Sequence, residues 1–287
     1  MVFCSDATGW PLDQAGRAVT LAAFYLMLPA LAWLVRRYSG EEQAGWLTVV
    51  FTLLCPLYIF YARAFLIDPI ALTLTLWYLR CFVPAVERGE PRAIIGANLF
   101  GLAAGLVKIM TLMLFAVPLA VYFGRRLWRA GIEHGWRQGP VQLLQRWAAS
   151  SLLPVAGSYA WIRFADAVKA QHPSGRALVS EAMHTYHFGS WSDRFDPGWW
   201  STIYRTVTTH VAPLPTLTIV LVLGVLGLFR RDGKLAALIL MFTAGPLIFP
   251  RLYSIHEYYF VAAGVFLTAG LGMAVALSAA NRDHSPG

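Results

Sequence analysis

Three short stretches combine ionisable and aromatic side chains in ways that could hold a charged substrate. The first is YARAFLIDP, in which Arg63 and Asp68 stand five residues apart, directly before Pro69. Ionisable groups at the edge of an apolar segment are costly unless they are paired or hydrated, which makes them candidates for a functional site. The simpler alternative is an Arg63–Asp68 ion pair that only closes a turn.

The second stretch, GLAAGLVKIM, contains Lys108 as the single charge within a long apolar run. Backbones can approach each other closely beside Gly101 and Gly105, and an ammonium group there would suit a phosphate at the level of the lipid headgroups. Alternatively, the long side chain of Lys108 simply extends to water at the membrane surface.

The third stretch, RLYSIHEYY, brings together Arg251, His256, Glu257, Tyr258 and Tyr259. If these residues form a helix, His256 and Tyr259 share one face and Glu257 points elsewhere. An aromatic belt at the membrane surface would explain the tyrosines, but it requires neither the arginine nor the histidine. One histidine without a partner four residues away is weak support for a metal site, so a divalent metal stays only an alternative and no cofactor is assigned.

Other familiar chemical patterns are missing from the sequence. There is no GxSxG motif, no glycine-rich phosphate loop and no HExxH motif. His184 and His187 lie three residues apart in MHTYHFG, where a solvated loop is the simpler interpretation. The three cysteines, Cys4, Cys55 and Cys81, are far apart, which is typical of packing residues and excludes a disulfide framework or a CxxC metal site.

The composition indicates a membrane protein. Of the 287 residues 57% are hydrophobic and only 13% are charged, with a mean hydropathy of +0.55, which leaves too few charges to cover a soluble globule. The net charge of +8 does not indicate nucleic-acid binding, because the arginines are scattered between apolar segments. We therefore predict an all-α, polytopic transmembrane helix bundle, with residues 1–287 forming a single domain.

Nine apolar stretches approach the length of about 20 residues that a membrane-spanning helix needs. A single helix over 93–124 would be about 48 Å long, against a hydrocarbon core of ~30 Å, so we predict a turn near Gly105–Lys108. The predicted spans are Ala18–Val35, Ala44–Ala62, Pro69–Val86, Ala93–Val107, Ile109–Phe123, Trp147–Ile162, Thr206–Phe229, Leu235–Phe249 and Tyr258–Ala280.

Alternating these spans collects the plain arginine clusters on one side, which the positive-inside rule makes cytoplasmic. Those clusters are Arg36-Arg37, Arg88/Arg92, Arg125–Arg146, Arg230–Lys234 and Arg282. The C-terminus is then cytoplasmic, and the three polar stretches face outward. So does the loop 164–205, whose Trp191, Trp199 and Trp200 predict short amphipathic helices in the membrane interface. An outward N-terminus without a signal peptide leads us to expect a further helix upstream of this sequence.

The three polar stretches resemble, in order, the motifs of a family of membrane enzymes. YARAFLIDP resembles the Y-S-R-x-x-x-x-D turn, GLAAGLVK the G-x-x-x-G-L-x-x-x-T-K segment, and RLYSIHEYYF the late H-x-Y-Y motif of GT-C class membrane glycosyltransferases. The branch is the one with dolichyl-phosphate-mannose protein mannosyltransferases, aminoarabinose transferases and RgtA/B/C/D-like sugar transferases. The resemblance runs from Gly16 to about Gly272.

The resemblance implies transfer of a sugar from a polyprenyl-phosphate donor to a glycan, lipid or protein acceptor at the outer face of the inner (plasma) membrane. Asp68 matches the second outer acid of the family. The groups that would bind the substrate or its lipid phosphate are Arg63, Lys108, Arg251, His256, Tyr258 and Tyr259. Positive charge placed at a departing phosphate stabilises it as its negative charge develops.

One departure concerns the primary base. The family's catalytic acid, usually an Asp-Glu pair, follows a first helix that this sequence lacks, and neither Asp6 nor Asp13 stands in that pattern. Val107 replaces the threonine before the family lysine. Activity of the chain alone is therefore an open question, and two other functions remain. A transporter of an anionic lipid would use the same cations without breaking a bond, and a membrane scaffold would leave the polar turns unexplained.

Overall fold

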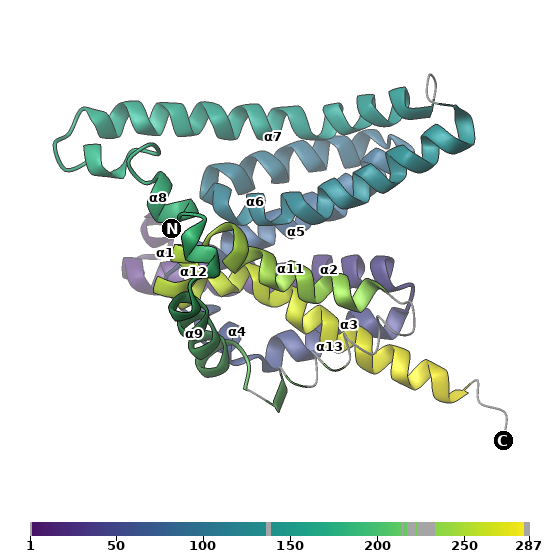
Figure 1. Ribbon diagram of the computed structural model, residues 1–287. Helices are drawn as coiled ribbons and strands as arrows, with labels where there is room; N and C mark the ends of the chain where they lie inside the picture. Colours follow the sequence, from purple (N-terminus) through teal and green to yellow (C-terminus); the bar gives the residue numbers. More distant parts are fainter. Residues whose placement is uncertain are drawn as a thin grey trace. The chain divides into compact units, whose positions relative to one another are not determined.

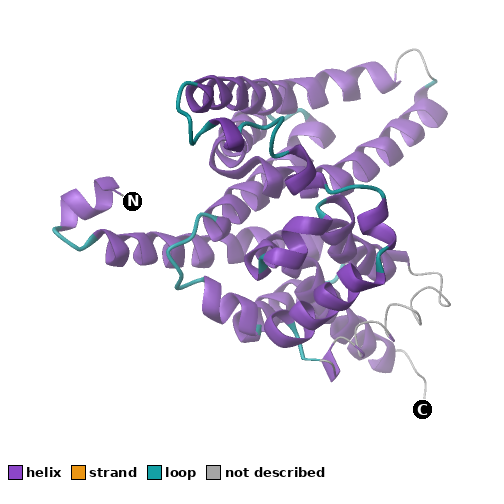
Figure 2. Ribbon diagram, turned by 60° about the vertical axis from the view of Figure 1, so that its left-hand side comes forward, coloured by secondary structure: helices purple, strands orange, loops and turns teal. Residues whose placement is uncertain are grey.

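The computed structural model describes residues 2–135, 139–213 and 233–283, together with the isolated positions 215, 216, 218 and 222. These residues are almost entirely helical, and no strand occurs among them, which confirms the predicted all-α class (Figure 2). They form two compact units. The first unit is Met1–Pro69 together with His184–Gly287, and the second unit is Ile70–Met183.

The first unit combines helices from its N-terminal stretch with helices from its C-terminal stretch (Figure 1). From the N-terminal stretch come α1 (Val2–Thr8), α2 (Leu12–Ser39), α3 (Glu42–Leu54) and α4 (Pro56–Tyr61). From the C-terminal stretch come α8 (His184–Phe188), η2 (Ser192–Phe195), α9 (Pro197–Thr206), the π-helix η3 (Val207–Val211), α11 (Gly233–Ile248), α12 (Pro250–Ile255), η4 (Glu257–Tyr259) and α13 (Phe260–Asp283).

Helix α13 lies against both α3 and α11 and forms the centre of the first unit. Small residues allow the close approach of α13 to α3. A Cβ atom on Gly272 would stand 2.6 Å from the backbone nitrogen of Thr48. The hydroxyl groups of Thr52 and Thr268, both buried, form a hydrogen bond of 3.0 Å between the two helices. Buried hydroxyls must be satisfied in this way, so the bond also fixes the register of the pair.

The predicted span Ala44–Ala62 is not one helix. Helix α3 ends at Leu54, and Pro56 is the first residue of α4, while Cys55 between them has extended backbone with ψ 124. A proline ring disfavours helical conformation in the residue before it and has no N–H for the helix, so the break follows from the sequence Cys55-Pro56.

The second unit contains α5, α6 and α7. Helix α5 spans Asp68–Arg88, and its first two residues belong to the first unit; α6 spans Pro91–His134 and α7 spans Gly139–Ala170. Helix α6 lies along α7, where Gly101 leaves room for the ring of Pro154. A short η1 helix (Arg176–Leu178) follows α7.

Helix α6 is interrupted at Lys108, whose φ of −160 and ψ of 95 are not helical. A side-chain carbon of Leu112 lies 3.7 Å from the position of a Cβ on Gly105. Seven residues of continuous helix would separate these positions by about 10 Å along the axis, so the chain bends sharply here. The predicted turn near Gly105–Lys108 is confirmed.

Four helical segments of the described chain are long and apolar enough to cross a membrane: Leu12–Ser39, Asp68–Arg88, Pro91–Glu133 and Glu257–Ala279. These segments indicate a membrane protein, but the nine predicted spans are not confirmed. Helix α11 is apolar and shorter, and α7 covers the predicted span Trp147–Ile162 and continues to Ala170. The predicted span Thr206–Phe229 and the pair Arg230-Arg231 lie mostly outside the described residues.

Candidate functional site

The polar turn after α4 and the polar turn after α12 meet within the first unit. The phenol of Tyr61, at the end of α4, donates a hydrogen bond of 2.9 Å to the Oε1 atom of Glu257, at the start of η4. A bond between a phenol and a carboxylate is charge-assisted and therefore stronger than one between neutral groups. Two of the three stretches singled out in the sequence thus belong to one cluster of side chains.

Asp68 is the second acidic residue of this cluster, beside Glu257. It is the first residue of α5, where a negative charge suits the positive end of the helix dipole, and only 5% of it is exposed. Its charge acts on four phenols that surround this part of the first unit, those of Tyr61, Tyr253, Tyr258 and Tyr259. Burial, and after it the charge of Asp68, raises the pKa of Tyr253. The tyrosines therefore remain protonated hydrogen-bond donors beside a carboxylate.

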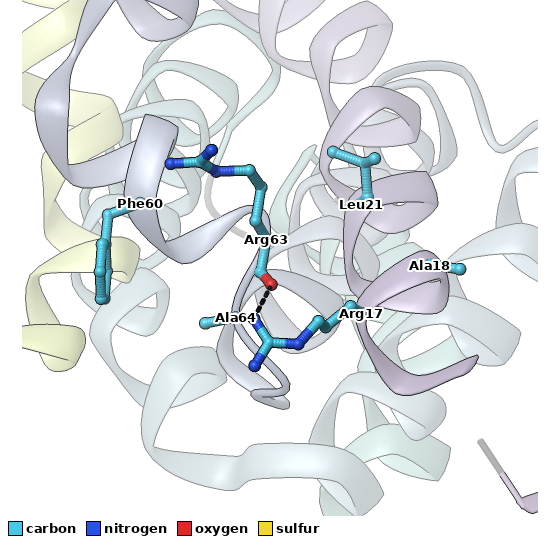
Figure 3. Close-up of a pocket in the computed structure, with 6 residues that line it drawn as sticks. All are labelled: Arg17, Ala18, Leu21, Phe60, Arg63 and Ala64. Atoms are coloured by element: carbon cyan, nitrogen blue, oxygen red, sulfur yellow. Dashed lines mark hydrogen bonds between the residues drawn. The ribbon is translucent and has the colours of Figure 1, made fainter. Parts of the chain in front are cut away.

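Arg63 lies in the same turn as Asp68 and lines a pocket of about 420 Å³ with Arg17, Leu21 and Phe60 (Figure 3). The Nε of Arg63 donates to the carbonyl of Ile59 at 2.9 Å. Its own carbonyl accepts a bond of 3.2 Å from Nη1 of Arg17. In Figure 3 the guanidinium of Arg63 points away from that carbonyl, towards the side where Phe60 lies. The pocket thus combines two cations with apolar walls.

Within the described part of the chain, most N–H groups of the two pocket arginines form no hydrogen bond with the protein. A guanidinium carries five N–H groups. Arg63 uses one of them for Ile59, and Arg17 uses one for the carbonyl of Arg63 and one for an ion pair of 2.9 Å with Asp13. Asp13 offsets part of the positive charge, so the pocket carries a modest net attraction for an anion.

Arg251, at the start of α12, is held by the loop that precedes α9. Its Nε donates to Oδ2 of Asp193 at 3.0 Å, and its guanidinium lies 5.9 Å from the ring centre of Trp199. The backbone N–H of Ser190, together with Arg251, keeps the pKa of Asp193 below its ordinary value, against the opposing effect of burial. Arg251 is thus fixed in position through its Nε atom. Among the described residues, its two terminal nitrogens donate no hydrogen bond, so they can bind a ligand.

His256 lies at the end of α12 and is not part of a helix with Tyr259. Its backbone is extended, with φ −134 and ψ 117, so the prediction that the two residues share a helical face is wrong. The imidazole instead stacks on the ring of Tyr258, with centroids 4.9 Å apart, and its Nε2 lies 3.1 Å from the phenol oxygen of Tyr186. The centroid of Tyr259 is 6.2 Å away.

Lys108 belongs to the second unit, at the bend of α6, and it is half-buried. Because Arg63 and Arg251 belong to the first unit, the predicted meeting of Lys108 with them stays a prediction. The extended backbone at Lys108 does establish that this residue stands at a break between two helical segments. Lys108 is therefore not a residue in the middle of a straight helix.

Sequence reasoning gave no role to four residues that connect the cluster: Tyr61, Tyr186, Asp193 and Glu257. Glu257 was named in the third polar stretch but was expected to point away from His256 and Tyr259. Tyr61 begins the first polar stretch, so a signal for it was present in the sequence. Tyr186 and Asp193 carry no local signal, because their partners lie 70 and 58 residues away. Over the described ranges, no group of three or more His, Cys, Asp or Glu side chains could hold a metal ion.

Comparison with known proteins adds no relative. No family model matches the chain, and neither a curated protein nor a solved structure matches it. Any functional assignment therefore rests on the residues and the geometry of the site.

Proposed function

We propose that this chain is a membrane glycosyltransferase of the GT-C type, which takes a sugar from a polyprenyl-phosphate donor at the outer face of the plasma membrane. The observation that carries the proposal is the joining of the 61–68 and 250–259 turns through Tyr61 and Glu257, with Asp68 beside them. A cluster of a buried carboxylate and phenols, with one arginine in each of the two joined turns, suits a substrate that has both a polar head and a hydrocarbon tail.

In the proposed reaction an acceptor hydroxyl attacks the anomeric carbon of the sugar. The bond between that carbon and the phosphate oxygen breaks, the proton of the hydroxyl passes to a carboxylate base, and the polyprenyl phosphate leaves with the electron pair. Arg63 and Arg251 of the first unit would hold the phosphate, because fixed cations stabilise a leaving group whose negative charge grows. That Lys108 takes part stays a prediction. Tyr258, Tyr259 and His256 would donate hydrogen bonds to the sugar or the phosphate.

Asp68 has a supporting role in this proposal. Its burial, and the four phenols on which its charge acts, suit a carboxylate that orients sugar hydroxyls. The primary base is not assigned to a residue. The acceptor would be a glycolipid, a polysaccharide or a protein of the cell envelope.

The test measures sugar transfer by membranes that contain the full chain or its variants. Asp68→Asn and Arg63→Ala should lose most of the transfer while inserting into the membrane normally. Arg92→Ala is the matched control, because Arg92 is an exposed arginine of the second unit and should leave transfer unchanged. Wild-type turnover by both site variants would remove Asp68 and Arg63 from the site. Movement of an intact lipid-linked sugar without product would instead support a carrier.

A further inference from the structure

The turn before α9 exposes two aromatic side chains and buries an acidic side chain between them. Trp191 and Phe195 are 78% and 79% exposed, whereas Asp193 between them is only 8% exposed. Water would favour the opposite arrangement, because large apolar surface is normally removed from water and charges are left in it. An inverted pattern of this kind indicates that the outer side of the turn meets something other than water.

Hydrogen bonds from Arg194 hold the conformation of this turn, so the exposure of Trp191 and Phe195 belongs to an ordered structure. Its guanidinium donates to the carbonyls of Ser190 and Phe188 at 2.8 and 3.0 Å. It also donates to the carbonyls of Leu247 and Ile248 at 2.9 and 3.2 Å. These last two carbonyls belong to the C-terminal end of α11, where a helix leaves carbonyl groups unpaired. Arg194 therefore caps α11 and holds the turn against it.

Two of the three tryptophans predicted to lie in the interface are only partly exposed, and each contacts another residue of this unit. Trp200 donates from Nε1 to the carbonyl of Arg194 at 2.8 Å, and Trp199 lies beneath the guanidinium of Arg251. Trp191 alone remains exposed, with the guanidinium of Arg194 5.1 Å from its ring centre. The exposed large apolar side chains of the turn are thus Trp191 and Phe195. The exposed Leu247 is linked to the turn through its carbonyl, which accepts from Arg194.

These three side chains, which we name the aromatic patch, lie at the height where apolar helices end. Helix α11 finishes at Ile248, and the apolar segment Glu257–Ala279 begins nine residues further on. Trp and Phe are favoured at the boundary between headgroups and acyl chains, and the indole of Trp suits the polar side of that boundary. The level of the helix ends and the chemistry of the exposed residues thus agree.

We propose that the aromatic patch, Trp191, Phe195 and Leu247, inserts into the interface of the lipid bilayer and anchors the 188–200 loop to it. The occupant of this surface is lipid. Asp193 lies within the same turn and pairs with Arg251, so the anchor also sets the depth of Arg251 relative to the headgroups. This inference requires a membrane but does not require glycosyl transfer.

The test places an environment-sensitive NBD fluorophore at Phe195→Cys in the full chain, with the three native cysteines replaced, and reconstitutes the protein in phosphatidylcholine nanodiscs. Quenching is measured with lipids that carry a nitroxide near the top or near the end of the acyl chain, and with aqueous iodide. The matched control is the same label at Glu42→Cys, where the native side chain is 72% exposed at the start of α3.

We expect blue-shifted emission at position 195, strong quenching by the shallow nitroxide, weaker quenching by the deep one, and little loss to iodide. The label at position 42 should be quenched by iodide and not by either lipid. Full iodide quenching at position 195 without lipid quenching would overturn the proposal and would make the patch a docking surface for a protein. A chain in which Trp191→Cys carries the label repeats the test, so one misfolded variant does not decide the outcome.

Discussion

The change Arg194→Ala tests the capping role of this residue in the first unit. The substitution removes four hydrogen bonds to carbonyl oxygens, two of them to the end of α11. A hydrogen bond contributes about 1 kcal/mol net, and water replaces part of what is lost at a half-exposed site, which leaves an expected loss of about 2–3 kcal/mol in local stability. Since 1.4 kcal/mol is tenfold, amide exchange through local opening should rise on the order of 10²-fold.

The loss of local stability is measured as faster hydrogen exchange of the 184–200 segment, followed by mass spectrometry on the protein in nanodiscs. Arg194→Lys should fall between wild type and Arg194→Ala, because an ammonium has three donors and lacks the planar fork of a guanidinium. Arg205→Ala is the matched control, since Arg205 is exposed on α9. Wild-type exchange in Arg194→Ala would refute the view that this side chain holds the turn.

Three further predictions concern the first unit and its pH dependence. Gly272→Ala should lower the free energy of unfolding by about 1–3 kcal/mol, measured as a lower melting temperature, because the new Cβ meets the backbone of Thr48. Gly124→Ala, with open space around it, should be neutral or slightly stabilising, and equal effects of the two changes would contradict this packing. Tyr61→Phe and Glu257→Ala should show a coupling of about 1 kcal/mol in a double-mutant cycle of thermal unfolding, and simple additivity would mean that their bond contributes nothing. The pKa of Asp193 is lowered in the folded protein, so its contribution to stability is complete above its ordinary pKa of about 4 and is lost as the pH falls through the lowered pKa. Asp193→Asn should therefore flatten the acid side of a curve of stability against pH. An unchanged acid side would show that Asp193 does not contribute to the acid dependence.

The helices were predictable where hydropathy and length suffice. Leu12–Ser39 and Glu257–Ala279 contain the predicted spans near Ala18–Val35 and Tyr258–Ala280 almost completely, because about 20 apolar residues in sequence have few other uses. The bend at Lys108 was predicted for a similar reason, since one helix would have been too long. The single span over 44–62 was wrong although Pro56 signals the break, because hydropathy alone does not respond to backbone geometry.

The candidate site was predictable only in part. The 61–68 and 250–259 stretches drew attention through their unusual mixtures of side chains, and the structure brings Tyr61 and Glu257 together. The same reasoning found no role for Asp193 or Tyr186, because a hydrogen bond across a long sequence separation leaves no local pattern. The contacts that partly cover Trp199 and Trp200 were not predictable either, since composition gives the number of aromatic residues but not the partner of each one.

The first unit is built from two separate stretches of the chain, so its two parts are synthesised at different times. Helix α3 buries Ala44 and Thr48 in the unit that α13 completes, yet about 190 residues separate Pro69 from the start of α13, which corresponds to about 10–40 s of translation. Ile70–Met183 emerges in full during this interval, whereas the first helices must wait beside the insertion machinery without their central neighbour. In a nascent chain arrested before residue 260, the face of α3 that packs on α13 would therefore be covered by lipid or by a chaperone.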